Sequence, residues 1–449
     1  MCAVVGIFGN DDASKLAGMA LFAMQHRGHE ACGISAGGSD DKKIITIKDR
    51  GFVRDVFAQK EFNILKGNIA IGHNRYSTAG GDSIFDAQPI QAKYKLGEIS
   101  VVHNGNLVNK DKVRNRLIDE GSIFQTGMDT ENLIHLIAKS SQDKLRDRIT
   151  KSLTKLKGAY NFIIQSRSKL FVVRDPYGVR PLSIGKLKSG GWIIASETCC
   201  FDLVDAVFVR DVKPGEMLIF SKEFDEPESI ILDDTKEFRP CAFEYIYFSR
   251  PDSDIDGKNV YTTRVDMGKA LAKQDKDLKA DMVIPVPDSG VPAALGYARQ
   301  SGIPFELGII RNHYVGRTFI EPTQAMRNLK VKMKLSPISS LIKGKRLVVI
   351  DDSVVRGTTS KRIVKMLKDA GALEVHFRVA SPEIKYPCFY GIDTPTKEEL
   401  ISSNQSNEEV CKYIEANSLE YLSIDGLKEA IGTNRNYSMV SFDGDYFIK

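Results

Sequence analysis

The stretch RLVVIDDSVVRGTTS, residues 346–360, decides how the second half of the chain folds. Its apolar run LVVI is typical of a buried strand, which delivers Asp351 and Asp352 to its end. Gly357 permits a tight backbone path, and residues 358–360 open an amphipathic helix. Backbone amides and hydroxyls at a helix N-terminus form a site for an anion such as phosphate. The stretch therefore predicts a strand, a loop and a helix, with a phosphate site at the turn.

The two aspartates add a second chemistry to this turn. Asp351 and Asp352 cannot bind phosphate themselves, but they can accept hydrogen bonds from sugar hydroxyls and help to hold a magnesium ion. An Asp-Asp pair alone is explained equally well as the solvated end of a strand before a helix. The complete string favours a loop that takes a ribose 5-phosphate.

The segments around this loop repeat the order strand, loop, helix. DMVIPVP (281–287) leads into VPAALGYARQSG (291–302), and VHFRVAS (375–381) predicts a further strand. This order is typical of a parallel sheet covered by helices, whose ligands bind beyond the carboxyl ends of the strands. Ser289 follows the first strand, where a diphosphate could meet backbone amides. RNHYVGRTFI (311–320) combines cations with aromatics, as either a closing lid or a solvated basic loop would.

The first half, up to about residue 220, has a different pattern, in which short strand-like runs are broken by glycine-rich turns. Two amphipathic helical stretches, 14–28 and 129–140, interrupt the runs. Strands in series with few helices predict antiparallel sheets packed with helices, an α+β domain. The runs are AVVGIFG (3–9), KIITIKD (43–49), NIAIGHNRYS (68–77), ISVVHNG (99–105), NFIIQS (161–166), LFVVRD (170–175), WIIAS (192–196) and GEMLIF (215–220).

The acidic, proline-bearing residues 221–240 mark the boundary between the two patterns, although IILD (230–233) could form an edge strand. We therefore expect one domain over residues 2–235 and a second over residues 236–449, which ends in a helical tail.

Cys2 raises the question of catalysis in the first half. Free cysteine is often buried at such positions. If Met1 is removed, however, Cys2 gains a free amine, whose pKa of about 8 suits it to activate the thiol directly or through water. Attack on a carboxamide also needs oxyanion donors, and an amino-acid substrate needs an arginine and an aspartate for its charged groups. The required types are present as Asn104 and Gly105 in HNGNL, Arg75 in GHNRYST and Asp129 in TGMDTE.

Each of these residues has a structural explanation when it is taken alone. Asn-Gly is common in turns, Asp129 could cap a helix, and Arg75 could form a surface ion pair. Their combination is more specific, because MCAVVGIFG, QHRG, GHNRYST, HNGNL and GMDTE, in this order, resemble the glutaminase domain of class II amidotransferases. That resemblance implies a four-layer αββα domain of the N-terminal nucleophile type.

The string 346–360 resembles the phosphoribosyl diphosphate (PRPP) signature of type I phosphoribosyltransferases. A class II glutaminase domain followed by a type I phosphoribosyltransferase domain resembles the amidophosphoribosyltransferases. The resemblance includes three further strings, CAFEYIYFSRPDSDIDG (241–257), YVGRTFI (314–320) and CFYGID (388–393). The family implies that ammonia from glutamine passes inside the protein to PRPP and gives 5-phosphoribosylamine, diphosphate and glutamate. This pentosyl transfer is the first step of de novo purine synthesis.

The family also implies a role for each matching residue. In the first half, the implied catalytic residues are Cys2, Arg27, Asn104 and Gly105, and the implied glutamine-binding residues are Arg75, Tyr76, Thr78 and Asp129. In the second half, the implied PRPP-binding residues are Arg311, Tyr314, Asp351, Asp352, Ser353, Val354, Val355, Arg356, Gly357, Thr358 and Thr359. The magnesium-associated positions are Ser289, Asp351 and Asp352. Members are usually homo-oligomers, dimers or tetramers, that purine nucleotides inhibit.

The chain departs from the family in three places: the iron-sulfur cluster positions, the lack of a propeptide before Cys2, and residues 29 and 32. Members with an iron-sulfur cluster pair the equivalents of Cys241 and Cys388 with a cysteine-rich stretch near the C-terminus. Here that stretch reads NYSMVSFDG (436–444), without cysteine, and two thiolates are not the four that such a cluster requires. We therefore expect no cluster. The chain also has His29 and Cys32, in QHRGHEACG, where the family commonly has Gln and a small residue. The resemblance therefore implies the reaction but not the fine tuning near the glutamine pocket.

Composition limits the other function classes. The 63 basic residues nearly match the 58 acidic ones, so no nucleic-acid-binding surface stands out. No apolar run reaches membrane-spanning length, and the start of the chain lacks the layout of a signal peptide, which predicts a cytoplasmic protein. Because no propeptide precedes Cys2 in this sequence, we expect that maturation needs only the removal of Met1. Seven scattered cysteines, none in Cys-x-x-Cys spacing, predict neither a disulfide framework nor a zinc site.

Two other functions stay open at this point. A phosphoribosyltransferase that uses a purine or pyrimidine base would have the second half but no use for the glutaminase residues. A nucleotide-binding regulator with degenerate catalysis would not need Cys2, Asn104 or the Asp351-Asp352 pair intact.

Overall fold

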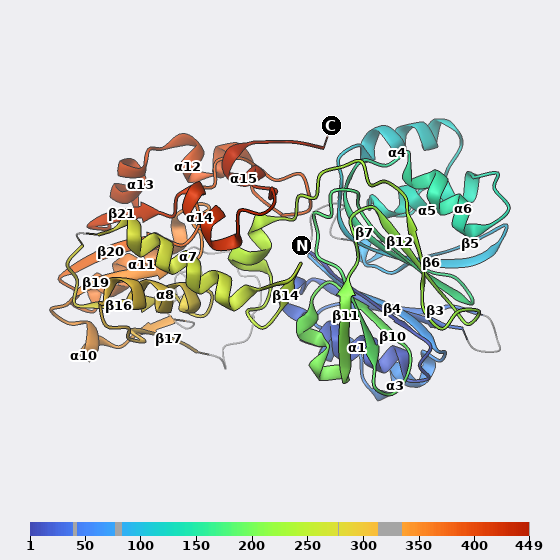
Figure 1. The fold of residues 1–449 in the computed structure, drawn as a ribbon, viewed down its shortest axis with the longest axis horizontal. Coiled ribbons are helices and arrows are strands. Elements are labelled where there is room, and N and C mark those ends of the chain that lie inside the picture. The colour runs from blue at the N-terminus through green and yellow to red at the C-terminus, as the bar shows by residue number, and fades with distance from the viewer. Residues whose placement is uncertain (39–42, 77–82, 277, 313–334, 449) are drawn as a thin grey trace.

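The computed structural model describes residues 1–38, 43–76, 83–276, 278–312 and 335–448 (Figure 1). Two lobes lie side by side, and the N-terminus lies between them (Figure 1). Two antiparallel sheets form the first lobe, and a parallel sheet lies in the second.

The first sheet places the N-terminal strand at its centre. β1 (Ala3–Phe8) pairs with β4 on one side and β10 on the other, and all pairings are antiparallel. The apolar side chains of β1 therefore lie in the middle of the domain, and Cys2 precedes this buried strand directly. The strand order is β11 (Ala206–Asp211), β9 (Ser183–Leu187), β10 (Trp192–Ala195), β1, β4 (Ile69–Arg75), β2 (Ala31–Gly37) and β3 (Ile45–Arg50).

The second sheet packs face to face against the first. Val4 and Ile194 from the first sheet share a core with Val102 and Ile163 from the second. The strand order is β13 (Glu228–Ile231), β12 (Glu216–Ser221), β8 (Lys169–Arg174), β7 (Gly158–Gln165), β6 (Gly97–Leu107) and β5 (Ile90–Tyr94).

Helices cover the outer faces of both sheets, which confirms the predicted αββα layers. α1 (Ala13–Ala23) packs on the first sheet, and a separate core joins α4, α5 and α6 to the second. The helices of this lobe are α1, α2 (Val53–Val56), α3 (Gln59–Ile64), α4 (Lys110–Asp119), α5 (Thr130–Lys139) and α6 (Leu145–Leu153).

The parallel sheet has the predicted alternation of strands and helices. Its order is β16 (Met282–Pro285), β19 (Arg346–Asp351), β20 (Glu374–Val379) and β21 (Ser418–Tyr421), and every pairing is parallel. α8 (Val291–Ser301) follows β16, and α11 (Thr358–Asp369) follows β19. The other helices of this lobe are α7 (Val260–Gln274), α10 (Ser339–Ile342), α12 (Ile401–Asn404), α13 (Asn407–Ile414), α14 (Ile424–Ile431) and α15 (Val440–Asp443).

Short elements complete the second lobe. β14 (Asp254–Ile255) pairs with β15 (Lys258–Asn259), and β17 (Ile309–Arg311) pairs with β18 (Leu335–Pro337). A π-helical turn, Glu244–Phe248, follows shortly after the boundary segment, residues 221–240, predicted from the sequence. Within that segment, the first two residues of IILD (230–233) belong to β13 (Glu228–Ile231), which lies at the edge of the second sheet. The edge-strand alternative is therefore confirmed for this part of the segment.

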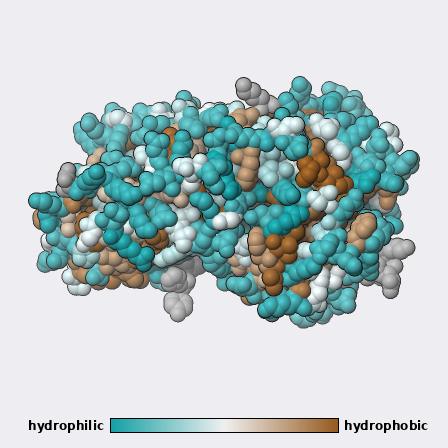
Figure 2. All heavy atoms as spheres, in the orientation of Figure 1, coloured by the Kyte–Doolittle hydropathy of each residue, from teal (hydrophilic) through white to brown (hydrophobic). Residues whose placement is uncertain are grey.

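An apolar patch lies on the surface at the strand β11. Figure 2 shows a mainly hydrophilic face with hydrophobic surface around β11, where Val207, Phe208 and Val209 are 55%, 47% and 44% exposed. β11 lies at the edge of its sheet. Within the described part of the chain, no helix combines the length and apolar composition needed to cross a bilayer.

Candidate active sites

Cys2 lies at the junction of the two lobes, at the start of the central strand β1. Its side chain is buried, and its Sγ donates to the carbonyl oxygen of Tyr76 at 3.5 Å. The Cys2 carbonyl accepts a hydrogen bond from Nε of Arg27 at 3.0 Å. The structure thus brings together Cys2, Arg27 and Tyr76, which are far apart in sequence.

Asn104 and Gly105 face Cys2 from β6 in the second sheet. The backbone N–H of Cys2 donates to Oδ1 of Asn104 at 3.4 Å. Nδ2 of Asn104 is buried, and no acceptor lies within hydrogen-bonding distance of it among the described residues. Gly105 adopts φ +149°, and a Cβ there would lie 2.0 Å from the carbonyl oxygen of Ala159. An amide and a backbone N–H at this place are the donors that a tetrahedral oxyanion needs.

Arg75 and Asp129 are both buried. Arg75 ends β4, and its Nη2 lies 3.9 Å from Oδ2 of Asp86. Asp129 accepts from the backbone N–H of Leu107 at 2.9 Å and lies 3.2 Å from Nδ1 of His103. Although burial alone raises the pKa of Asp129, His103 and the hydrogen bonds lower it below its usual value. Asp129 therefore stays a carboxylate.

Asp129 could have been a simple helix cap, and the structure decides against that alternative. It occupies the N-cap position of α5, but its side chain makes no capping hydrogen bond. The carboxylate is bonded instead toward β6, the strand that carries Asn104 and Gly105. Thr78, the remaining predicted glutamine-binding residue, lies outside the described residues.

The surroundings of Cys2 shift the pKa of its thiol in opposite directions. Burial raises the pKa of the Cys2 thiol, whereas the terminal amine, the hydrogen bond to Tyr76, Arg75 and Arg27 lower it. In this structure the amine belongs to Met1, and burial lowers its pKa to about 6. Removal of Met1 would place the amine on Cys2 itself.

The predicted phosphate loop lines a pocket of about 460 Å³ in the second lobe. Gly357, at φ +70°, precedes the first residue of α11, so the loop ends at a helix N-terminus as the sequence predicted. The site residues that line the pocket are Tyr76, Ser289, Asp351, Asp352, Ser353, Val354, Val355, Arg356, Gly357, Thr358 and Thr359. Loop and helix therefore present their amides and hydroxyls to one cavity.

Asp351 and Asp352 are buried beside this pocket. Burial raises the pKa of both carboxyls, and their mutual repulsion raises that of Asp351 further. The side chains of Ser289 and Ser353 donate to Asp352. No group of three or more His, Cys, Asp and Glu side chains within the described ranges is arranged to hold a metal ion alone. An oxygen pair of this kind fits Mg²⁺ whose other ligands are water and substrate phosphate.

Of the predicted PRPP-binding residues, Arg311 does not line the pocket. Arg311 ends β17, is exposed, and forms an ion pair with Asp288. Tyr314 lies outside the described residues, as does the rest of the segment YVGRTFI (314–320).

Arg27 has partners that the sequence interpretation missed. Its guanidinium donates to Oε1 of Glu197 at 2.6 Å and to both carboxylate oxygens of Glu244, at 3.0 and 2.9 Å. All three side chains are buried. The sequence held one sign of this contact: Glu244 stands within the apolar string CAFEYIYFS (241–249), and a buried carboxylate requires a cation as its partner.

Cys241, Cys388 and the stretch 436–444 are the positions that the family resemblance relates to an iron-sulfur cluster, and they pack together in the second lobe. Cys241 pairs with Ser438 as an isolated parallel bridge, and Cys388 belongs to the same buried core as Cys241. Burial raises the pKa of Cys241 to about 11, so it is a thiol at neutral pH. Cys32 is likewise a core thiol, whose pKa burial raises to about 12, while His29 packs edge-on against Tyr76.

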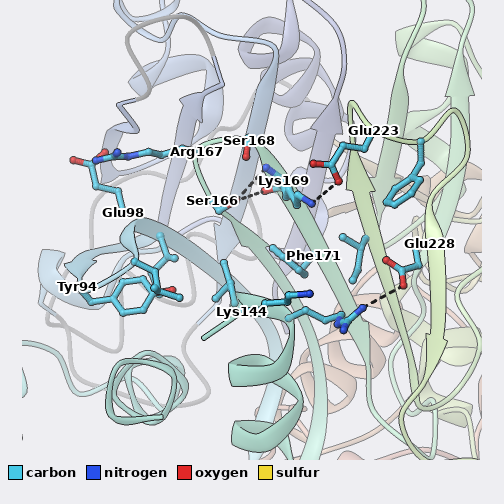
Figure 3. A pocket seen from close by; sticks show the side chains of 16 residues that line it. Tyr94, Glu98, Lys144, Ser166, Arg167, Ser168, Lys169, Phe171, Glu223 and Glu228 are labelled. Carbon is cyan, nitrogen blue, oxygen red and sulfur yellow. Dashed lines mark hydrogen bonds and ion pairs between the residues drawn. The ribbon is translucent and has the colours of Figure 1, made fainter. Parts of the chain in front are cut away.

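A further pocket, of about 700 Å³, lies on the second sheet of the first lobe (Figure 3). The ion pairs Lys169–Glu223 and Arg146–Glu228 cross it. It contains none of the predicted site residues, and we interpret it as a charged surface groove.

Known proteins match both parts of the chain. The family model described as "Glutamine amidotransferase domain" matches residues 73–202, and that described as "Phosphoribosyl transferase domain" matches residues 262–383. The amidophosphoribosyltransferase of Bacillus subtilis is 48% identical over 451 residues, which cover 99% of this chain and 94% of that protein. Amidophosphoribosyltransferase 1, chloroplastic, of Arabidopsis thaliana is 49% identical over 449 residues, covering 100% of this chain and 79% of that protein.

A solved structure agrees over the whole chain. It is the glutamine PRPP amidotransferase from B. subtilis complexed with ADP and GMP, with 47% identity and a TM-score of 0.93. The alignment covers 100% of this chain and 98% of that one. The fold confirms the α+β and parallel-sheet classes predicted from the sequence, and the chain belongs to the amidophosphoribosyltransferase family of enzymes.

Proposed function

We propose that this protein hydrolyses glutamine at Cys2 and passes the ammonia internally to PRPP, giving 5-phosphoribosylamine, diphosphate and glutamate. This reaction is the first step of de novo purine synthesis. One observation carries the proposal: Tyr76 touches both sites. Its carbonyl oxygen accepts a hydrogen bond from the Cys2 thiol, and Tyr76 also lines the pocket that contains Asp351 and Asp352.

The first reaction uses the free thiolate of Cys2. Once Met1 is removed, the amine of Cys2 takes the thiol proton, and the sulfur attacks the carboxamide carbon of glutamine. Asn104 Nδ2 and the Gly105 N–H stabilise the oxyanion that forms. The Cys2 amine returns that proton to the departing nitrogen, and neutral ammonia leaves the tetrahedral species. The glutamyl thioester that remains is hydrolysed by water to glutamate and the free thiol. Arg75 and Asp129 bind the carboxylate and the ammonium of the substrate.

The second reaction takes place over the phosphate loop. The backbone amides and hydroxyls of residues 353–359 bind the 5-phosphate of PRPP at the start of α11. Asp351 and Asp352 accept hydrogen bonds from the ribose hydroxyls and, with Ser289, help to hold Mg²⁺. When bound, Mg²⁺ neutralises charge on the diphosphate leaving group. Exclusion of water keeps ammonia unprotonated and prevents hydrolysis of PRPP.

The remaining expectations extend the same proposal. We infer a domain boundary near residue 235, an assembly of two or four copies, and inhibition by purine nucleotides. The B. subtilis relative was solved with ADP and GMP, which supports the last point. The cytoplasmic location and the absence of an iron-sulfur cluster stay predictions from the sequence.

The deciding assay is glutamine-dependent release of diphosphate from PRPP. We expect Cys2→Ala to lose this activity and to keep turnover with added ammonia, because only the first site is removed. Glutamine-dependent turnover by Cys2→Ala would overturn the mechanism. The mass of the intact protein measures in parallel whether Met1 is absent.

A further inference from the structure

One carboxylate from the second lobe reaches the site of Cys2. Glu244 lies 217 residues after Arg27, yet its two oxygens bind Nη1 and Nη2 of Arg27 at 3.0 and 2.9 Å. Two parallel charge-assisted hydrogen bonds fix the plane of a guanidinium as well as its position. The third side of the same guanidinium donates through Nε to the carbonyl of Cys2.

The carboxylate is itself held rigidly. Glu244 is buried, and it accepts further hydrogen bonds from Oγ of Ser249 at 2.8 Å and Nη1 of Arg180 at 3.3 Å. Although burial alone raises the pKa of Glu244, Arg27 lowers it below its usual value. Glu244 is therefore an ionised, fixed partner for Arg27.

The element that carries Glu244 also reaches the second site. Glu244 opens the π-helical turn that ends at Phe248, and Tyr247 and Phe248 line the pocket of the phosphate loop. One turn of five residues thus contacts the support of Cys2 at one end and the PRPP pocket at the other.

We propose that Glu244 is a positioning residue of the glutaminase site, which it serves from the phosphoribosyltransferase lobe by holding Arg27 against the backbone of Cys2. The inference rests on the proposed function and adds to it. It means that the glutaminase site is complete only when the second lobe is docked. Glu244 touches no reacting atom and acts through Arg27.

The first test is the kinetics of Glu244→Gln, which keeps the shape of the side chain and removes its charge. We expect kcat for glutamine hydrolysis to fall by at least about 10-fold, because small displacements in an active site are that costly. We expect the KM for glutamine and the ammonia-dependent rate to change by less than about twofold, since neither depends on Arg27. An unchanged kcat would overturn the proposal.

Glu216→Gln is the matched control. Glu216 is also buried and bidentate, and it accepts from Nη1 and Nη2 of Arg210 at 2.8 Å each. It lies on β12 in the second sheet, and its hydrogen-bond partners differ from those of Arg27. We expect this variant to keep the wild-type kcat. An equal loss in Glu216→Gln would show a general effect of broken buried pairs and would overturn the assignment.

Two further variants separate positioning from stability. Ser249→Ala removes a single hydrogen bond from the Glu244 carboxylate, so kcat should fall in the same direction by a smaller factor. The double variant Arg27→Gln/Glu244→Gln should be no slower than Arg27→Gln alone, because Glu244 acts only through Arg27. Losses that multiply would contradict the proposal. The Ser249→Ala variant keeps the test valid if Glu244→Gln folds poorly.

The pH profile of Cys2 alkylation gives a readout that a merely structural role would not move. Among the described residues, the charged groups near the thiol are the terminal amine, Arg75 and Arg27. Glu197, Glu244 and Arg180 lie behind Arg27, and the His26 ring contacts Glu197. If Glu244→Gln lets Arg27 move away, the thiolate loses a cation and the midpoint rises. If Glu244 acts only as a nearby negative charge, its removal lowers the midpoint, which would overturn the proposal.

Alkylation by iodoacetamide is followed on the Cys2 peptide by mass spectrometry, so it needs no turnover. A wild-type protein that fails to hydrolyse glutamine would refute the proposed function, whereas this profile would still test the link from Glu244 through Arg27 to Cys2.

Discussion

A methyl group on Gly105 would lie 2.0 Å from the carbonyl oxygen of Ala159 on the neighbouring strand β7. The backbone of Gly105, at φ +149°, is also one that residues with a side chain rarely adopt. We predict that Gly105→Ala displaces β6 and lowers the rate of glutamine hydrolysis by about 100-fold, the usual effect of losing one oxyanion donor. The assay is glutamate release, with ammonia-dependent turnover measured in parallel.

Gly51→Ala is the control for this substitution. Gly51 also has a positive φ, +113°, but apart from its chain neighbours no heavy atom of the described residues lies within 4 Å of a Cβ placed there. It should lose some stability and keep glutamine hydrolysis. Normal hydrolysis by Gly105→Ala would argue against an oxyanion site at this strand.

Asp86 connects two residues of the glutamine site. Its Oδ1 accepts from the backbone N–H of Gly127 at 2.7 Å, two residues before Asp129, and its Oδ2 faces Arg75. We predict that Asp86→Ala raises the KM for glutamine by about 10-fold with a smaller effect on kcat, because substrate binding is lost rather than chemistry. Steady-state kinetics of glutamine hydrolysis measure both constants.

Asp281→Asn tests the specificity of that effect. Asp281 likewise accepts from a backbone N–H and a guanidinium, both of Arg346, but it lies at the start of the parallel sheet. Its KM for glutamine should equal that of the wild type. A raised KM in both variants would point to a general loss of structure.

Glu131 makes the stability of the loop before Asp129 depend on pH. Although burial raises its pKa, the nearby His135 ring and hydrogen bonds from the backbone N–H groups of Gln125 and Thr126 and from the Thr126 hydroxyl lower it to about 2. A depressed pKa stabilises the fold above the unfolded value of 4.5, and the contribution is lost as pH falls toward 2. We predict that Glu131→Gln loses on the order of 2–3 kcal/mol of the free energy of unfolding at pH 7.

Urea unfolding at pH 7 and at pH 3 measures this difference, which should shrink at the lower pH. Glu120→Gln, an exposed glutamate at the end of α4, should change little at either pH. A difference for Glu131→Gln that is independent of pH would mean that shape, not charge, is responsible.

The Asp351-Asp352 pair separates the two reactions. Asp352→Asn should lower ammonia-dependent turnover of PRPP by about 100-fold or more, because a group that stabilises the reacting charge is lost. Hydrolysis of glutamine without PRPP should continue. Removal of Mg²⁺ with a chelator should have the same selective effect and be reversed by added Mg²⁺. Asp369→Asn is the control. Asp369 is exposed at the end of α11, the helix that follows the phosphate loop, and this variant should be active in both assays.

The absence of an iron-sulfur cluster is tested by analysis of iron and acid-labile sulfide in pure protein. We expect neither in stoichiometric amount, and we expect turnover to persist in air. Cys388→Ser should keep activity, because the sulfur only accepts the backbone N–H of Tyr390 at 3.3 Å, which a hydroxyl can also do. Stoichiometric iron, or loss of activity in Cys388→Ser, would refute the prediction.

The phosphate loop could be predicted because its parts are consecutive. A buried strand, two aspartates, a glycine and a helix start occupy residues 346–360, and each local preference agrees with the fold. The strands with apolar β-branched runs were predicted for the same reason. β2, ACGISAG, was missed because small residues give no clear alternation, and it becomes a strand only through pairing with β3 and β4.

The supports of Cys2 could not be predicted in this way. Glu197 and Glu244 approach Arg27 from 170 and 217 residues away, and no local pattern encodes such a distance. The same holds for Asp86, whose partners lie on β4 and on the loop before α5. Motif residues were therefore predictable, whereas the residues that hold them in place depended on the tertiary structure.

Arg27 and Arg180 share Glu244 as a counter-ion across the two lobes. In evolutionary terms, this shared ion restricts how genes for such lobes are recombined. A glutaminase unit cut out of this chain and fused to a different synthase would bury both guanidinium groups without Glu244, and among the described residues the other carboxylate paired with them is Glu197, which binds Arg27. A productive new fusion must therefore bring its own carboxylate to the same place, or lose both arginines together.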